Sequence, residues 1–189
     1  MGLYQQIRDY RGYNEQEERD REMMLRFMEQ NMDYLERTNE TAHFSASVWV
    51  VNSDRTKVLM VYHNIYHAWS WIGGHADGEE DLKAVAMREL REETGVMQAR
   101  LVSEEIFSLE SLTVDGHEKR GKYVPSHLHL NVTYLAVAQE EEELVVKPDE
   151  NSGVRWFEVG EALEVCEEEW MVERIYRKLV EKSQKGWGR

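Results

Sequence analysis

The stretch from Gly74 to Val96 constrains this chain most, because it combines a helical pattern with a row of inward-facing carboxylates. The apolar positions on one face of the predicted helix are Leu82, Val85 and Ala86. At 3.6 residues per turn, the same face continues onto Glu89 and Glu93, with Glu92 at its margin. A solvated acidic face would lie opposite the apolar stripe. The pattern therefore predicts a helix whose last turns direct carboxylates into the protein.

This carboxylate group predicts a metal site. Close like charges repel and raise one another's pKa unless a cation lies among them. A group of oxygen ligands suits a hard divalent metal, most often Mg²⁺. Sites made only of oxygen ligands also accept Mn²⁺. We therefore expect Mg²⁺ at this helix, with Mn²⁺ as the alternative ion.

The same stretch resembles the Nudix box, G-x5-E-x7-R-E-U-x-E-E-x-G-U, in which U is a bulky aliphatic residue. The nine specified positions are all matched, by Gly74, Glu80, Arg88, Glu89, Leu90, Glu92, Glu93, Gly95 and Val96. In looser form the resemblance spans the chain from about His43 to its end. It implies an α/β fold, the Nudix-like α/β/α sandwich with a mixed β-sheet, which also suits the order of the predicted elements.

The resemblance also implies roles for residues of the box. The candidate metal ligands are the Gly73 carbonyl, Glu89, Glu92 and Glu93. Glu89 or another nearby glutamate is implied to activate water, and the resemblance leaves open which one. Arg88 lies four residues before Glu92, so it is placed to orient or neutralise a carboxylate. Glu80 is expected to support these catalytic residues rather than to bind the metal.

Three histidines give weaker signals. His75 directly follows Gly74, so we expect it near the metal, with or without a contact to substrate. His127 and His129 alternate with Asn131 on one face of a predicted strand, where they either line the substrate cleft or stand on a solvated face. No cysteine or compact ligand set accompanies them in the sequence, so a zinc site is not predicted.

Other candidates lie outside the box. Trp69 and Trp71 are candidates to stack on a base, although core packing explains aromatic residues as well. Arg120 belongs to a small basic loop that is either solvated or binds an anionic group of the substrate. Glu150, in a loop before a predicted strand, is a candidate extra ligand or base.

Composition limits the classes of partner. The chain has 189 residues, a net charge of -14 and a pI near 5.0, which argues against DNA or other non-specific nucleic-acid binding. A small nucleotide substrate remains compatible, because metal ions offset its charge. The lone Cys166 cannot form an internal disulfide, and no signal-like amino terminus or long apolar run is present. We therefore expect a cytoplasmic protein that does not enter a membrane.

The first 39 residues differ from the rest, so we expect a helical arm (1–39) and a Nudix hydrolase domain (40–189). Asn14-x-x-Glu17 resembles a capping box, and apolar residues at helical spacing continue to Leu35. The residues from Met1 to Tyr13 are expected to form a shorter helix. The arm is expected to pack on the domain or on a second subunit of a homodimer, and a substrate lid or partner-binding module is the alternative.

Alternation and turn signals predict the remaining elements. The predicted strands are His43–Val51, Lys57–His63, a strand near Ala99–Leu109, Ser126–Ala138 and Val154–Glu158. The expected closing helices are Glu161–Val165 and Glu167–Lys182. The residues from Asp115 to Lys122 are expected to form a charged loop.

The Nudix resemblance implies a metal-dependent hydrolase that cleaves a diphosphate linkage in a nucleoside diphosphate derivative. The substrate classes left open are ADP-ribose and sugar nucleotides, dinucleoside polyphosphates and nucleoside triphosphates. One alternative is a non-catalytic nucleotide-sensing domain, although sensors usually carry a degraded box. An isopentenyl diphosphate isomerase requires a cysteine in the cleft, and Cys166 lies far along the chain. An RNA-end hydrolase requires more basic surface than this chain has.

Overall fold

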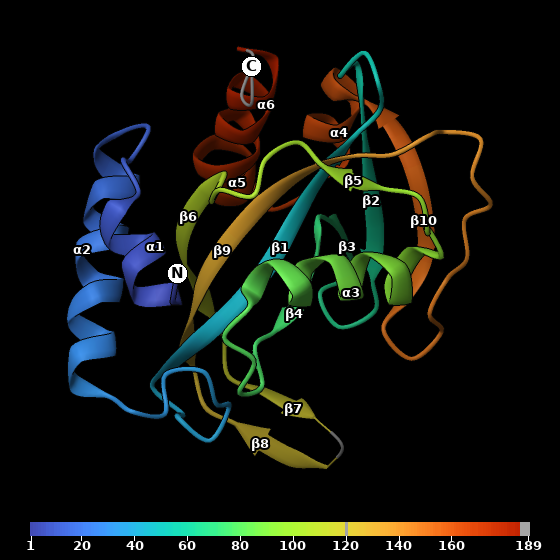
Figure 1. The fold of residues 1–189 in the computed structure, drawn as a ribbon. Coiled ribbons are helices and arrows are strands. Elements are labelled where there is room, and N and C mark those ends of the chain that lie inside the picture. The colour runs from blue at the N-terminus through green and yellow to red at the C-terminus, as the bar shows by residue number, and fades with distance from the viewer. Residues whose placement is uncertain (120, 186–189) are drawn as a thin grey trace.

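A mixed β-sheet forms the centre of the protein in a computed structural model, which describes residues 1–119 and 121–185 (Figure 1). Its main strand order is β10-β2-β1-β9-β5, while β3 pairs with β2, β4 with β1, and β6 with β9. The strands of this sheet are β1 (Ala42–Val51), β2 (Lys57–His63), β3 (Ala68–Ser70), β4 (Ile72–His75), β5 (Arg100–Leu101), β6 (Ser108–Val114), β9 (His127–Val137) and β10 (Asn151–Glu158). β1 and β9 run parallel, and the other pairs are antiparallel.

Helices cover both faces of the sheet, as the α/β/α prediction requires (Figure 1). Helix α3 (Leu82–Thr94) packs into one core with alternate residues of β1 such as Phe44 and Val48. The other face of β1 presents Trp49 to a second core, formed with α4 (Val159–Val165), the π-helical turn η1 (Val172–Tyr176) and α6 (Arg177–Gln184). Alternation along a strand thus gives each face of the sheet its own core.

Helix α3 forms where the sequence predicts it. The Asp81 side chain accepts a hydrogen bond from the Ala84 amide at 3.1 Å, which caps the amino-terminal end. Gly95 ends the helix at φ 75°, a left-handed conformation that favours glycine. The buried stripe continues onto Glu93, as predicted, and the neighbouring Thr94 is buried as well.

The arm consists of α1 (Leu3–Asp9) and α2 (Glu15–Gln30), which lie beside β6 (Figure 1). The predicted cap is confirmed, because the Asn14 side chain accepts from the Glu17 amide at 2.9 Å. The expectation that the helix reaches Leu35 is wrong. The backbone becomes extended at Asn31, whose amide and side chain both donate to the Phe27 carbonyl, and Met32 is 96% exposed.

Three expectations about elements need correction. The predicted loop at 115–122 contains β7 (His117–Lys119) and β8 (Lys122–Val124), short charged strands that lack the apolar alternation of a buried strand. The strand expected near 99–109 is two strands, β5 and β6. The last predicted helix is divided into α5 (Glu169–Met171), η1 and α6. No helix among the described residues is both long and apolar enough to span a bilayer.

Candidate active site

Three carboxylates converge at the carboxyl-terminal half of α3. Glu89 and Glu93 lie one turn apart on α3, and Glu150 comes from the loop before β10. One oxygen of each lies within 4.8 Å of the others. We call these three residues the acidic cluster. Its oxygen donors fit a hard divalent cation, which is the ion that the sequence predicts.

The two glycines of β4 hold the acidic cluster close to the sheet. A Cβ atom on Gly74 would lie 2.5 Å from the carboxyl carbon of Glu89. A Cβ atom on Gly73 would lie 2.5 Å from the Ala46 carbonyl oxygen. Neither position has room for a side chain, so the glycine pair permits the close approach of β4 to β1 and of Glu89 to the backbone of β4.

Burial and mutual repulsion make the acidic cluster electrostatically unfavourable without a cation. Burial, together with the Glu89 and Glu150 charges, raises the pKa of Glu93 to about 8, although Lys147 and the Gly73 amide partly offset the rise. Burial also raises the pKa of Glu89, and the neighbouring Glu92 charge adds to that rise. A divalent ion would remove both penalties, so the residues present fit the metal that the sequence implies.

Glu92, the other predicted ligand of the helix, lies at the margin of this group. Its carboxylate is 3.1 Å from Lys147 Nζ, and its side chain is 46% exposed. Lys147 Nζ also lies 3.0 Å from Glu150. Burial alone would lower the pKa of this ammonium group. Hydrogen bonds to Glu150 and Glu92 outweigh that effect, so the pKa lies above its usual value. Lys147 therefore places a positive charge between Glu92, a residue of the Nudix box, and Glu150, which lies outside it.

Arg88 and Glu80, two further charged residues of the box, have different surroundings. Arg88 has its guanidinium 3.6 Å from Glu89 Oε1, which suits the predicted role of neutralising a carboxylate. Glu80 is exposed and accepts a hydrogen bond at 3.0 Å from the Leu3 amide at the start of α1. It therefore contacts the arm, and the structure does not bring it into the acidic cluster.

The predicted aromatic residues pack within the second core. Trp69 is edge-on to Phe157, with ring centroids 4.7 Å apart, and Trp71 is edge-on to Tyr176 at 5.7 Å. Both tryptophans remain partly exposed. Packing accounts for their position, and a contact with substrate stays a prediction.

The structure brings the predicted histidines together with a fourth that the sequence did not single out. His75, His127 and His129 surround His43, so the expectation that no compact ligand set accompanies them is wrong. Asn131, expected beside them either in the substrate cleft or on a solvated face, is instead fully buried and hydrogen-bonded to Ser45 and other polar groups. Arg120 lies outside the described residues.

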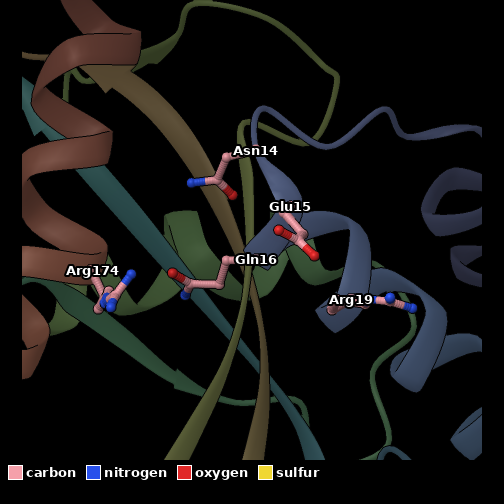
Figure 2. A pocket seen from close by; sticks show the side chains of 5 residues that line it. All are labelled: Asn14, Glu15, Gln16, Arg19 and Arg174. Atoms are coloured by element: carbon pink, nitrogen blue, oxygen red, sulfur yellow. The ribbon is translucent and has the colours of Figure 1, made fainter.

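A shallow hollow elsewhere is lined by polar side chains (Figure 2). Its lining consists of Asn14, Glu15, Gln16, Arg19 and Arg174. These residues belong to the start of α2 and to η1, and none of them is a candidate from the box. We therefore assign no part of the acidic site to this hollow.

Two residues near these sites escaped the sequence reasoning. His43 lies inside a strand in which every residue is buried, so it reads as a core position. Lys147 lies in a segment without a motif, and only its position next to the loop of Glu150 links it to the site. Such contacts depend on the fold of distant segments.

Known proteins similar to this chain were found in sequence and in structure. The family model of the NUDIX domain matches residues 41–181. A 60-residue segment, 32% of this chain, is 42% identical to "Nudix hydrolase 25" of Arabidopsis thaliana and spans 34% of that protein. The chain therefore aligns with only about a third of this relative.

Three solved structures share the fold. A C. elegans Ap4A hydrolase has TM-score 0.53 and 20% identity over 75% of this chain and 95% of its own. The E. coli dihydroneopterin triphosphate pyrophosphohydrolase has TM-score 0.56 and 18% identity over 72% and 94%. A NUDIX-family hydrolase from Clostridium perfringens has TM-score 0.51 and 22% identity over 72% and 95%. The family model covers most of the chain and the folds agree, so this chain belongs to the Nudix family.

Proposed function

We propose that this protein hydrolyses a diphosphate linkage in a nucleoside diphosphate derivative, with Mg²⁺ or Mn²⁺ as its cofactor. The observation that carries the proposal is the acidic cluster, which combines two box carboxylates with Glu150 against the glycine pair. Family membership supplies the reaction class. The substrate classes remain ADP-ribose and sugar nucleotides, dinucleoside polyphosphates and nucleoside triphosphates.

The chain's own residues have separable tasks in this proposal. Glu89, Glu93 and Glu150, with Glu92 at the margin and the Gly73 carbonyl, would hold the ion. A bound divalent ion supplies stabilisation of the charge that develops on phosphate oxygens. One carboxylate at the site accepts a proton from the attacking water, whose oxygen bonds to one phosphorus of the linkage. The bridging P–O bond breaks, and the products are two phosphate-bearing fragments.

The isomerase alternative conflicts with the position of Cys166. The thiol donates a hydrogen bond to the Trp69 carbonyl at 3.2 Å, within the second core. Burial raises the pKa of this thiol to about 12, so little thiolate forms near neutral pH. A buried, protonated cysteine that is not part of the acidic cluster does not supply the cysteine that an isomerase needs.

A substrate panel tests the proposal. The panel covers the substrate classes above with Mg²⁺ and with Mn²⁺, and phosphate is measured after a coupled phosphatase. Metal-dependent turnover of one class would establish the hydrolase and identify its substrate. Tight nucleotide binding by calorimetry without turnover would instead favour the non-catalytic sensor.

Gly74→Ala is expected to reduce turnover while leaving the fold in place. The added methyl group would meet the Glu89 carboxyl group at 2.5 Å, so that carboxylate must move away from β4. A displacement of about 1 Å costs roughly a hundredfold in rate. The measurement is kcat with Mg²⁺, with Gly160→Ala as the control because its added Cβ meets nothing within 4 Å. Equal rates for both variants would contradict this account of the glycine pair.

Glu150→Gln is expected to weaken the apparent affinity for Mg²⁺ more than Asp149→Asn does. Glu150 is part of the acidic cluster, whereas its neighbour Asp149 is exposed and outside it. Loss of one charged ligand is expected to weaken binding by at least about tenfold, since even supporting partners of ligands contribute that much. The measurement is the Mg²⁺ dependence of turnover, and an unchanged midpoint would remove Glu150 from the proposed ligand set.

We further propose that residues 1–39 are an arm that supports the loop of the box in the domain of 40–189. Arg37 makes two hydrogen bonds to Asp77, at 2.6 and 2.7 Å, and the Gly78 amide donates to the Leu35 carbonyl at 3.1 Å. These contacts join the end of the arm to the turn before α3. A homodimer stays a proposal, which light scattering of the full chain tests.

A further inference from the structure

Four histidines from three strands meet at one end of the sheet. His43 lies on β1, His75 on β4, and His127 and His129 on β9. The parallel pairing of β1 with β9 places His43 opposite His129. The His43 ring centroid lies 5.2, 4.9 and 5.1 Å from those of His75, His127 and His129, respectively. We call these four residues the histidine cluster.

Three Nε2 atoms of the histidine cluster lie close together. His129 Nε2 lies 3.2 Å from His75 Nε2 and 3.2 Å from His127 Nε2. On the outer side, His43 Nδ1 is 3.1 Å from the Asn39 carbonyl, and His127 Nδ1 is 2.8 Å from the Pro125 carbonyl. A carbonyl only accepts hydrogen bonds, so both Nδ1 atoms carry protons. In the neutral rings, the Nε2 atoms of His43 and His127 therefore carry lone pairs and no protons.

The Nε2 lone pairs of His43 and His127 do not both have a hydrogen-bond donor. His43 is 4% exposed, and its Nε2 is buried with no hydrogen-bond partner. The contacts of His129 with His75 and His127 converge on the same Nε2, so its single proton serves one neighbour at a time. A buried acceptor without a donor costs free energy, and a cation at the centre would remove that cost.

We propose that the histidine cluster binds one Zn²⁺ ion. The His75 Nε2–His129 Nε2 separation of 3.2 Å is close to the ~3.3 Å edge of a tetrahedron with Zn–N bonds of about 2.0–2.1 Å, and the ligand atoms of His43, His75 and His129 all lie within 4.8 Å of one another. Imidazole nitrogen suits zinc, whereas Mg²⁺ and Mn²⁺ favour the oxygen ligands of the acidic cluster. The carbonyl contacts of the outer nitrogens are the partners that metal-bound histidines usually have.

The proposed zinc site and the acidic cluster lie on opposite faces of β4. Gly74 faces Glu89 on α3, and side-chain positions alternate along a strand, so His75 projects to the other face. His43, His75 and His129 offer three ligand atoms within 4.8 Å of one another, and His127 lies beside them. Zinc would join β1, β4 and β9 and so hold in place the strand that carries the glycine pair.

The test measures zinc in the full chain under conditions that occupy the acidic cluster with magnesium. Metal-free protein is dialysed against limiting Zn²⁺ with excess Mg²⁺, and retained zinc is counted by mass spectrometry. We expect one zinc per chain in the natural protein, in Glu93→Gln and in His67→Asn, since His67 is exposed and outside the cluster. We expect His129→Gln to weaken zinc binding by roughly a hundredfold or more, because even supporting partners contribute 10–100-fold.

X-ray absorption on the zinc-loaded natural protein gives a measurement that requires no variant. Scattering from three or four imidazole rings would support the proposal. Coordination mainly by carboxylate oxygen would overturn it, as would the absence of retained zinc or equal retention by folded His129→Gln protein. His75→Gln, at a partly exposed position of the same ligand group, provides a second variant if His129→Gln does not fold. None of these readouts depends on hydrolysis, so failure of the proposed activity would leave this result intact.

Discussion

Glu93→Gln is expected to lower turnover by roughly a thousandfold, about 4 kcal/mol of transition-state stabilisation at 1.36 kcal/mol per factor of ten. Glu93 is the most buried carboxylate of the acidic cluster and belongs to the box. Glutamine keeps the size of the side chain but removes the negative charge that would hold the metal. The measurement is kcat/KM with saturating Mg²⁺ on the substrate that the panel identifies.

The same variant is expected to remain folded. Burial and the neighbouring carboxylates disfavour the ionised form of Glu93, so a neutral side chain relieves repulsion in metal-free protein. We therefore expect its melting temperature in the presence of a chelator to equal or exceed that of the natural protein. Glu143→Gln, on an exposed turn, is the control and should change neither quantity. Folded Glu93→Gln protein with natural turnover would contradict the assigned site.

The residues of α3 were predictable because local rules agree there. Periodicity, the Asp81 cap and Gly95 all act within one helix, so the sequence alone indicates its ends and its buried face. Glu93 lies on that stripe and is buried, and Glu92 at its margin is exposed, as the helical geometry predicts. The residues of a site that lies on one helix can therefore be predicted from the sequence before the fold is known.

The parts that depended on tertiary pairing were not predictable. The histidine cluster requires the parallel register of β1 and β9 together with the antiparallel register of β4. Strand alternation places His127 and His129 on one face, but it does not show what faces them. The end of α2 at Gln30 depends on Asn31. Its side chain donates a hydrogen bond to the Phe27 carbonyl and so competes with the backbone hydrogen bonds that would continue the helix.

Glu17→Ala is expected to destabilise the protein by roughly 3–5 kcal/mol, the usual cost of removing one partner from a buried ion pair. Glu17 of the arm is fully buried, with Oε1 3.0 Å from Lys178 Nζ and 2.9 Å from Lys182 Nζ on α6. Its other oxygen accepts from the Tyr10 hydroxyl and the Tyr13 amide at 2.6 and 2.7 Å. Alanine would leave two buried ammonium groups with less compensating charge. The measurement is the free energy of unfolding in urea.

A surface ion pair on the neighbouring helical segment provides the control. Glu173 pairs with Arg177 at 2.8 Å, and both side chains are more than half exposed. Exposed pairs of this kind contribute about 0.3–0.5 kcal/mol, so Glu173→Ala should change stability only slightly. Similar losses in the two variants would show that the buried ion network does not hold the arm on the domain.

The pH dependence of the Glu17→Ala effect tests its electrostatic origin. Burial alone would raise the pKa of Glu17, but the Lys178 and Lys182 charges and hydrogen bonds from Ser108 and Tyr10 lower it from 4.5 to about 2. Because the folded pKa is the lower one, this stabilisation is present above 4.5 and is lost as the pH falls towards 2. Linkage gives the contribution as roughly 3 kcal/mol. Between about pH 5 and 2 the natural protein should therefore lose that much more stability than Glu17→Ala, because the variant has no carboxyl group there to protonate. Parallel stability curves over this range would mean that lost packing, and not lost charge, explains the effect of the substitution.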